Sequence, residues 1–358
     1  MEEYNNYKDW FNNDDSKRKV LEGIKLSGMP LELKTRKIFR EKGYDVTSAY
    51  YSPSTEQKEE LREIDIYAIK QEKGFSIDDF QVNFNFLFVG ECKYSGISDI
   101  LIFEYGDTNN LIIDNLPLFV NGHRLIKLLP QVRTSKYFGS PLFAEKAIQV
   151  NAAKPYGKKE YNYSNKLVHD ACEQITMASN FYFNRRGSFW RDFYNNTLNS
   201  PFFGDYKKAL ADGKIRSHED GFTKMPVEED VAEFFKKINK KMLGLLGLCI
   251  DVFFHVLIFD ESRGIMKVKT DELCNPKELE PIDYCIYLHT PVNLKNYDIF
   301  RESYSLPIII CNPESLRKVI SDLEKSMRSI INELENQLNS NPHTIPLEFL
   351  SDIKMIHG

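Results

Sequence analysis

A carboxylate and an ammonium stand at the end of an apolar stretch, in the sequence NFNFLFVGECKYS that begins at Asn83. Glu91 and Lys93 lie two positions apart, so on a β-strand their side chains point to the same face. An earlier segment, LREIDIYAIK, carries Asp65 between two isoleucines. A turn near Asp78 would make the two segments an antiparallel hairpin with Asp65 roughly opposite Glu91. We therefore expect two carboxylates and one ammonium to converge.

These three side chains favour one kind of chemistry. Two buried carboxylates repel each other unless a cation accompanies them. A hard divalent ion, Mg²⁺ or Mn²⁺, prefers oxygen ligands and takes one or two carboxylates together with waters and substrate phosphates. Asp65 and Glu91 would hold this metal, and Lys93 would orient or help to deprotonate a water, or neutralise charge on the phosphate. The residues suit metal-assisted hydrolysis of a phosphodiester bond.

The elements that must position these residues follow from the spacing of apolar residues. Helices are expected at 17–25, 31–42, 165–183, 228–245 and 314–338. Strands are expected at 44–52, 61–70, 84–93, 249–260, 264–270, 282–290 and 306–312. Alternation within 61–70 places Glu63 and Asp65 on one face and Ile64 and Ile66 on the other. The helix at 165–183 is expected to end before Arg185.

In this order the elements resemble the PD-(D/E)XK, or restriction-endonuclease-like, nuclease superfamily. The resemblance is carried by GMPLE at the start of a helix, REIDIYAIK on one strand and FVGECKYS on the next. It covers about residues 28–94, with weaker support from the helix around Gln174 and the strand DVFFHVLIF after it. It implies an α-β-β-β-α-β core, an α/β fold in which helices flank a mixed central sheet.

The resemblance also implies a set of site residues. Asp65 and Glu91 would bind the metal and Lys93 would be catalytic. Glu32 on the first helix would complete the site, and the backbone carbonyl of Cys92 would be a further ligand. Gln174 matches an accessory glutamine that some branches of the superfamily carry. Simpler interpretations remain open: a salt bridge for Glu91 and Lys93, a first-turn carboxylate for Glu32, and a structural amide for Gln174.

The expected organisation has five parts. They are an N-terminal helical segment (1–27), a nuclease core with the metal site (28–95), an insertion (96–164), the remainder of the core with a sheet extension (165–320), and a C-terminal helix and tail (321–358). The insertion departs from the pattern of the superfamily. It leaves open how the substrate would lie in the site, whereas the expected core is unaffected.

Composition narrows the classes of function. The chain has 358 residues with a net charge of −5, so a polyanion would have to bind at local patches. Six scattered cysteines without metal-ligand spacing indicate reduced thiols. Because no secretory leader or membrane span is recognisable, we expect a cytoplasmic protein. A P-loop is absent, which argues against an NTPase.

Of three basic clusters in the sequence, two are candidates for binding nucleic acid. Lys154, Lys158 and Lys159, and also Arg185 and Arg186, are interleaved with aromatic residues that suit backbone contact and base stacking. The cluster around Arg36 is expected to be a solvated helix face.

The sequence thus predicts a metal-dependent nuclease that cleaves DNA, an endonuclease in prokaryotic defence or DNA repair. It would act as a homodimer or under a regulatory partner protein. One alternative is a catalytically silent module of the same fold that binds nucleic acid or a protein. A second is a ribonuclease of the same fold.

Overall fold

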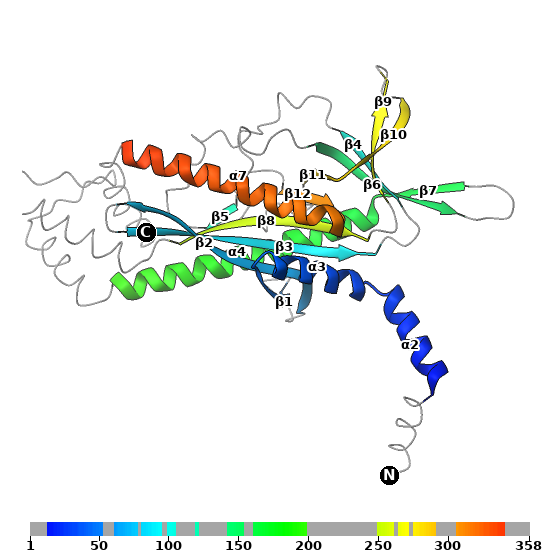
Figure 1. Cartoon of the computed structure of the whole chain (residues 1–358), viewed down its shortest axis with the longest axis horizontal. Coiled ribbons are helices and arrows are strands. Elements are labelled where there is room, and N and C mark those ends of the chain that lie inside the picture. The colour runs from blue at the N-terminus through cyan, green and yellow to red at the C-terminus, as the bar shows by residue number, and fades with distance from the viewer. Residues whose placement is uncertain are drawn as a thin grey trace, which may run out of the picture.

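The computed structural model describes residues 13–52, 61–77, 80–94, 99–104, 119–121, 142–153, 160–198, 249–260, 264–271, 275–290 and 306–340. These residues form an α/β fold in which helices flank one mixed sheet (Figure 1). The expected fold class is confirmed at this level. The helix expected at 228–245 lies outside the described residues.

One 12-stranded sheet joins the described strands. Its order is β1-β2-β3-β8-β12-β11-β6-β4-β9-β10, with β5 beside β8 and β7 beside β6. The strands are β1 (Asp45–Tyr51), β2 (Arg62–Ile77), β3 (Phe80–Lys93), β4 (Asp99–Glu104), β5 (Phe119–Asn121), β6 (Phe143–Ala153), β7 (Glu160–Ser164), β8 (Cys249–Phe259), β9 (Ile265–Thr270), β10 (Pro276–Ile282), β11 (Tyr284–His289) and β12 (Leu306–Cys311).

The centre of the sheet is built from strands that are buried on both faces. β3 pairs antiparallel with β2 and parallel with β8, and β8 pairs parallel with β12. Residues 84–92 of β3 and 251–259 of β8 are buried without interruption. Continuous apolar runs of this kind are typical of strands covered on both sides, whereas alternation is typical of strands with one wet face. The stretch FLFVG, residues 86–90, is apolar for this reason.

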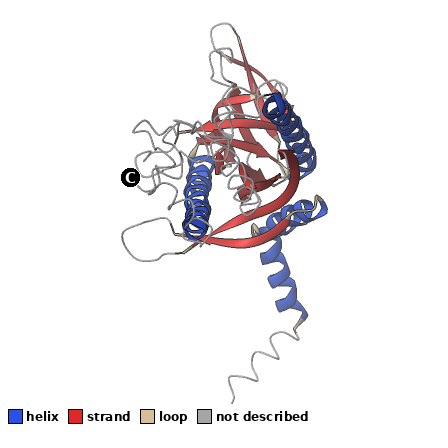
Figure 2. Ribbon diagram, turned by 90° about the vertical axis from the view of Figure 1, so that its left-hand side faces the viewer, coloured by secondary structure: helices blue, strands red, loops and turns tan. Residues whose placement is uncertain are grey.

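Helices cover both faces of the sheet (Figure 2). Ile175 of α4 (Lys166–Leu198) packs in one buried cluster with Leu87 and Val89 of β3. On the other face, Phe39 of α3 (Met29–Glu41) contacts Phe88 with ring centroids 5.0 Å apart. The helix α7 (Pro313–Ser340) lies against β2 and α3, and α2 (Asp14–Leu26) extends away from the sheet (Figure 1).

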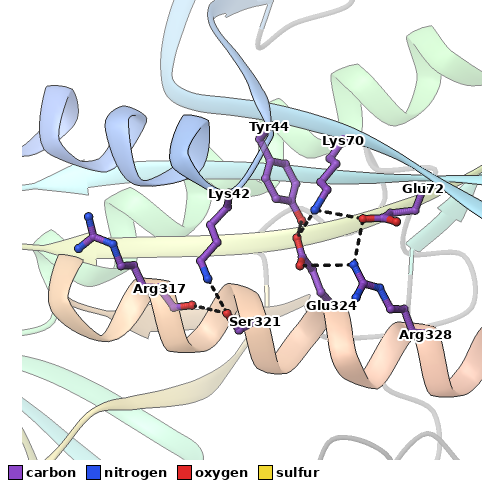
Figure 3. A network of polar contacts seen from close by, with 8 residues as sticks. All are labelled: Lys42, Tyr44, Lys70, Glu72, Arg317, Ser321, Glu324 and Arg328. Carbon is purple, nitrogen blue, oxygen red and sulfur yellow. Dashed lines mark hydrogen bonds and ion pairs between the residues drawn. The ribbon is translucent and has the colours of Figure 1, made fainter.

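A polar network joins α7 to the first two strands (Figure 3). The carboxylate of Glu324 accepts hydrogen bonds from the Tyr44 hydroxyl at 3.0 Å and from Lys70 at 2.9 Å. Lys70 also pairs with Glu72, which contacts Arg328 at 3.2 Å. Because Glu324 is only 13% exposed, water screens its contacts less than those of a surface ion pair, and these contacts connect the helix to the sheet.

Most expected elements are present, and four expectations need correction. The helix expected to stop before Arg185 continues to Leu198, since a single glycine at 187 costs a helix only about 1 kcal/mol. The single strand expected at 282–290 is preceded by a separate strand, β10, that pairs with β9. The segment 96–164 contributes strands of the main sheet, including β4 and β6. The expected boundary after residue 320 falls inside α7.

The described helices include none that is long and apolar enough to cross a membrane. The buried cysteines of these ranges, Cys92, Cys172, Cys285 and Cys311, are free thiols. Burial raises the pKa of the Cys311 thiol to about 12, so this side chain stays protonated near neutral pH.

Candidate active site

The hairpin of β2 and β3 brings Asp65 and Glu91 together. The paired residues Ile66 and Gly90 close the regular ladder, and Asp65 and Glu91 follow directly on their two strands. The Cys92 backbone amide donates a hydrogen bond to the Asp65 carboxylate at 2.8 Å. The predicted antiparallel hairpin is therefore confirmed, and its last described pair is Ile77 of β2 with Phe80 of β3.

Glu91 is the most deeply buried of the charged residues at this site, with 3% of its surface exposed. Burial is the main reason that its pKa is raised to about 7, and the neighbouring Asp65 raises it further. The ammonium of Lys93, 2.5 Å from the Glu91 carboxylate, opposes this shift. A cation bound beside Glu91 would favour its ionised form and lower this pKa.

Lys93 is held from two sides. Besides Glu91, its ammonium donates to the side-chain oxygen of Gln174 at 2.9 Å. Gln174 lies on α4, on the same helix that packs over Val89. The accessory position expected for Gln174 is therefore in contact with the predicted catalytic lysine.

A β-bulge sets the position of Asp65. Between the pairs Thr47–Tyr67 and Ala49–Ile64, β1 has the single residue Ser48 while β2 has two residues. Ile64 and Tyr67, three positions apart, consequently pack in the same cluster, although regular alternation would place them on opposite faces. The predicted alternation through Ile64 is therefore wrong, because the bulge resets it at Asp65.

Arg36 is a site residue that the sequence interpretation missed. It was expected on a solvated face, yet its side chain is only 12% exposed. It forms an ion pair with Glu32 one turn earlier on α3 and donates to the Asp65 carbonyl. The i,i+4 spacing of Glu32 and Arg36 was the available signal. Burial raises the pKa of Glu32, whereas Arg36 lowers it.

The donor chemistry of the site fits a hard divalent cation. Asp65 and Glu91 offer carboxylate oxygens. Glu32 lies near enough to Asp65 that the charge of Asp65 raises the pKa of Glu32. Within the described ranges, no group of three His, Cys, Asp or Glu side chains is arranged to hold one ion. Mg²⁺ commonly takes only one or two carboxylates and leaves its other positions to waters and phosphates.

The remaining predicted residues lie elsewhere or outside the described ranges. The Cys92 thiol is buried, so only the backbone of Cys92 could serve as a ligand. Arg185 is exposed on α4, roughly 16 Å along the helix axis from Gln174. Arg186 lies on the same helix. The cluster of Lys154, Lys158 and Lys159 falls outside the described residues.

Four elements thus place six polar side chains together: Glu32 and Arg36 from α3, Asp65 from β2, Glu91 and Lys93 from β3, and Gln174 from α4. Comparisons with protein-family models, curated proteins and solved structures gave no match. Buried carboxylates beside a fixed ammonium can bind a cation and stabilise an anionic reacting group.

Proposed function

We propose that the chain is a Mg²⁺-dependent nuclease of the restriction-endonuclease-like, PD-(D/E)XK type, which hydrolyses phosphodiester bonds of DNA. The observation that carries the proposal is the contact of Lys93 with both Glu91 and Gln174, at the point where Asp65 enters the same site. A fortuitous surface ion pair would not be expected to bury Glu91 at 3% exposure.

The buried carboxylate of Glu91 beside the partly buried Asp65 supports a cation site. Desolvation and the charge of Asp65 both raise the pKa of Glu91, so repulsion between the two carboxylates makes ionisation of Glu91 unfavourable. Held by Asp65 and Glu91, Mg²⁺ would remove this repulsion and supply positive charge beside the scissile phosphate. Glu32 would act at the edge of this site, because its carboxylate is already paired with Arg36.

Lys93 has the role of orienting the nucleophile. Hydrolysis forms a bond from a water oxygen to phosphorus and breaks the bond from phosphorus to a deoxyribose oxygen, which takes up a proton. The Lys93 ammonium can donate to the attacking water or to a phosphate oxygen, and Gln174 keeps this ammonium in place. The biological setting in defence or DNA repair, homodimer formation and control by a partner protein are part of the same proposal and rest on the family resemblance.

The test is cleavage of supercoiled plasmid, linear duplex DNA and single-stranded RNA with Mg²⁺ or Mn²⁺, and with EDTA as the metal-free control. Wild type should cut DNA, and Asp65→Ala and Lys93→Ala should each reduce the rate by about 10²-fold or more. Lys73→Ala is the matched control, because Lys73 is an exposed lysine at the far end of the same hairpin.

Any other outcome of this test would change the proposed function. Cleavage of RNA alone would make the chain a ribonuclease. If wild type cuts no substrate and yet retains nucleic acid in a binding assay, the chain is a silent binding module. Cleavage by both variants at the wild-type rate would contradict the proposed roles of Asp65 and Lys93.

A further inference from the structure

The bulge at Asp65 creates a structural requirement of its own. Two β2 residues, Asp65 and Ile66, lie opposite the single β1 residue Ser48, so the ladder between the strands is interrupted there. Backbone carbonyls in such a gap need a donor from outside the ladder. Movement of the backbone at the bulge would shift Asp65 relative to Glu91.

Arg36 supplies donors to both sides of this gap. Its Nε and Nη2 atoms donate to the Asp65 carbonyl at 3.1 Å and 2.9 Å, and its Nη1 atom donates to the Ser48 hydroxyl at 2.8 Å. One guanidinium thus connects the bulged residue of β2 with the residue that faces it on β1. The planar fork of arginine can make these contacts together, whereas a lysine ammonium offers a single point of contact.

The same guanidinium also holds a carboxylate of the site. Its Nη2 atom pairs with Glu32 on α3 and lies 3.8 Å from Glu63. The Arg36 side chain is 12% exposed and Glu32 is 25% exposed, so water screens this pair less than it screens the contact with Glu63, which is 45% exposed. Arg36 therefore fixes Glu32 and the Asp65 backbone relative to each other.

We propose that Arg36 is the positioning residue of the site: it fixes the bulge and thereby sets the distance of the Asp65 carboxylate from Glu91. This inference rests on the proposed nuclease function for its effect on catalysis, because a misplacement of about 1 Å can cost about 10²-fold in rate. Arg36 contacts the backbone of Asp65 and the carboxylate of Glu32, and it acts through these groups.

The test compares wild type with Arg36→Lys, Arg36→Met and the matched control Arg40→Met, in which an exposed arginine one turn later on α3 is removed. Plasmid cleavage with Mg²⁺ gives kcat and KM, electron paramagnetic resonance gives the affinity for Mn²⁺, and hydrogen exchange reports on the backbone. Arg36→Lys retains the charge beside Glu32, so it serves as the folded variant if Arg36→Met does not fold.

We expect Arg36→Met to lower kcat by about 10²-fold and Mn²⁺ affinity by about 10-fold, with KM little changed and Arg36→Lys intermediate. Hydrogen exchange should become faster in peptides that cover residues 62–67 and stay at the wild-type rate in 251–258 of β8. Arg40→Met should match wild type in every measurement.

Backbone exchange separates this inference from the nuclease assignment. If wild type cuts nothing while Arg36→Lys still loosens residues 62–67 selectively, the positioning role stands and the nuclease proposal fails. Unchanged exchange at 62–67 in Arg36→Lys, or an equal increase across β8, would overturn the positioning role whatever the cleavage results.

Discussion

The ammonium of Lys93 donates a 2.9 Å hydrogen bond to the side chain of Gln174, a residue 81 positions later in the chain. This contact joins the C-terminal end of β3 to α4, and it gives Lys93 a neutral partner besides the charged Glu91. A neutral acceptor limits the rotation of the ammonium without neutralising it, which suits a group that must donate to a reacting atom.

Replacing Gln174 by Leu should lower the rate of plasmid cleavage by about 10-fold, since Lys93 would keep its charge and lose one of its two anchors. Gln174→Glu restores an acceptor and should recover part of the rate. Asp170→Ala, an exposed position one turn earlier on α4, is the control and should cleave like wild type. Equal rates for Gln174→Leu and wild type would show that this contact has no role in catalysis.

Glu91 should make stability depend on pH. Folding raises its pKa to about 7 from about 4.3 in the unfolded chain, so the folded state binds this proton more tightly. The resulting stabilisation is fully present below about pH 4.3 and is lost as the pH rises through about 7. Glu91→Gln, which cannot ionise, should lack this loss.

Urea unfolding at pH 5 and pH 8, without divalent ions, measures the effect. Between these values the free energy of unfolding of wild type should fall relative to Glu91→Gln, by up to an amount on the order of 3 kcal/mol. Excess Mg²⁺ at pH 8 should restore part of the lost free energy of unfolding in wild type and have no such effect on Glu91→Gln. A constant difference between the two proteins at both pH values would argue against the raised pKa.

Gly90 should not tolerate a side chain. A Cβ atom there would lie 2.6 Å from the Val256 carbonyl oxygen of β8, and still closer to the Val256 Cγ2 atom. Gly90→Ala should therefore lower the free energy of unfolding by about 3 kcal/mol in urea titrations. Adding Val256→Ala should not rescue it, because the backbone carbonyl remains. Full rescue would show that only the Val256 side chain, and not its backbone carbonyl, excludes a Cβ atom at position 90.

The network around Glu324 should contribute to stability without contributing to catalysis. Glu324→Ala leaves Lys70 and the Tyr44 hydroxyl without this acceptor, so it should destabilise the fold by about 1–3 kcal/mol (Figure 3). Arg328→Ala should cost less than about 1 kcal/mol, since Arg328 is 57% exposed. Urea titration measures the free energy of unfolding of both variants. A larger loss for Arg328→Ala than for Glu324→Ala would contradict this prediction.

The sequence was sufficient to predict the hairpin and the convergence of Asp65, Glu91 and Lys93, because these depend on local turn chemistry and on the period of a strand. The bulge could not be predicted, since it arises from the pairing of β2 with a β1 that is one residue shorter there. Arg36 was missed for the same reason. Its partners are a carbonyl and a hydroxyl that become neighbours only when the strands pair.

Contacts between segments far apart in the chain could not be predicted from local sequence patterns either. Apolar content indicated that β3 and β8 are buried, but their parallel pairing follows from the path of the whole chain. Gln174 became a candidate through the family resemblance, and its contact with Lys93 depends on how α4 crosses the sheet.

The parallel ladder between β3 and β8 also bears on how the chain folds as it is synthesised. Asn85 and its partner Asp251 are 166 positions apart, whereas the hairpin that carries Asp65 and Glu91 is local. The hairpin can therefore form early, while the other edge of β3 waits for β8 with its apolar residues unprotected. The strand that holds Glu91 and Lys93 consequently exposes apolar residues to misassociation until β8 is synthesised and pairs with it.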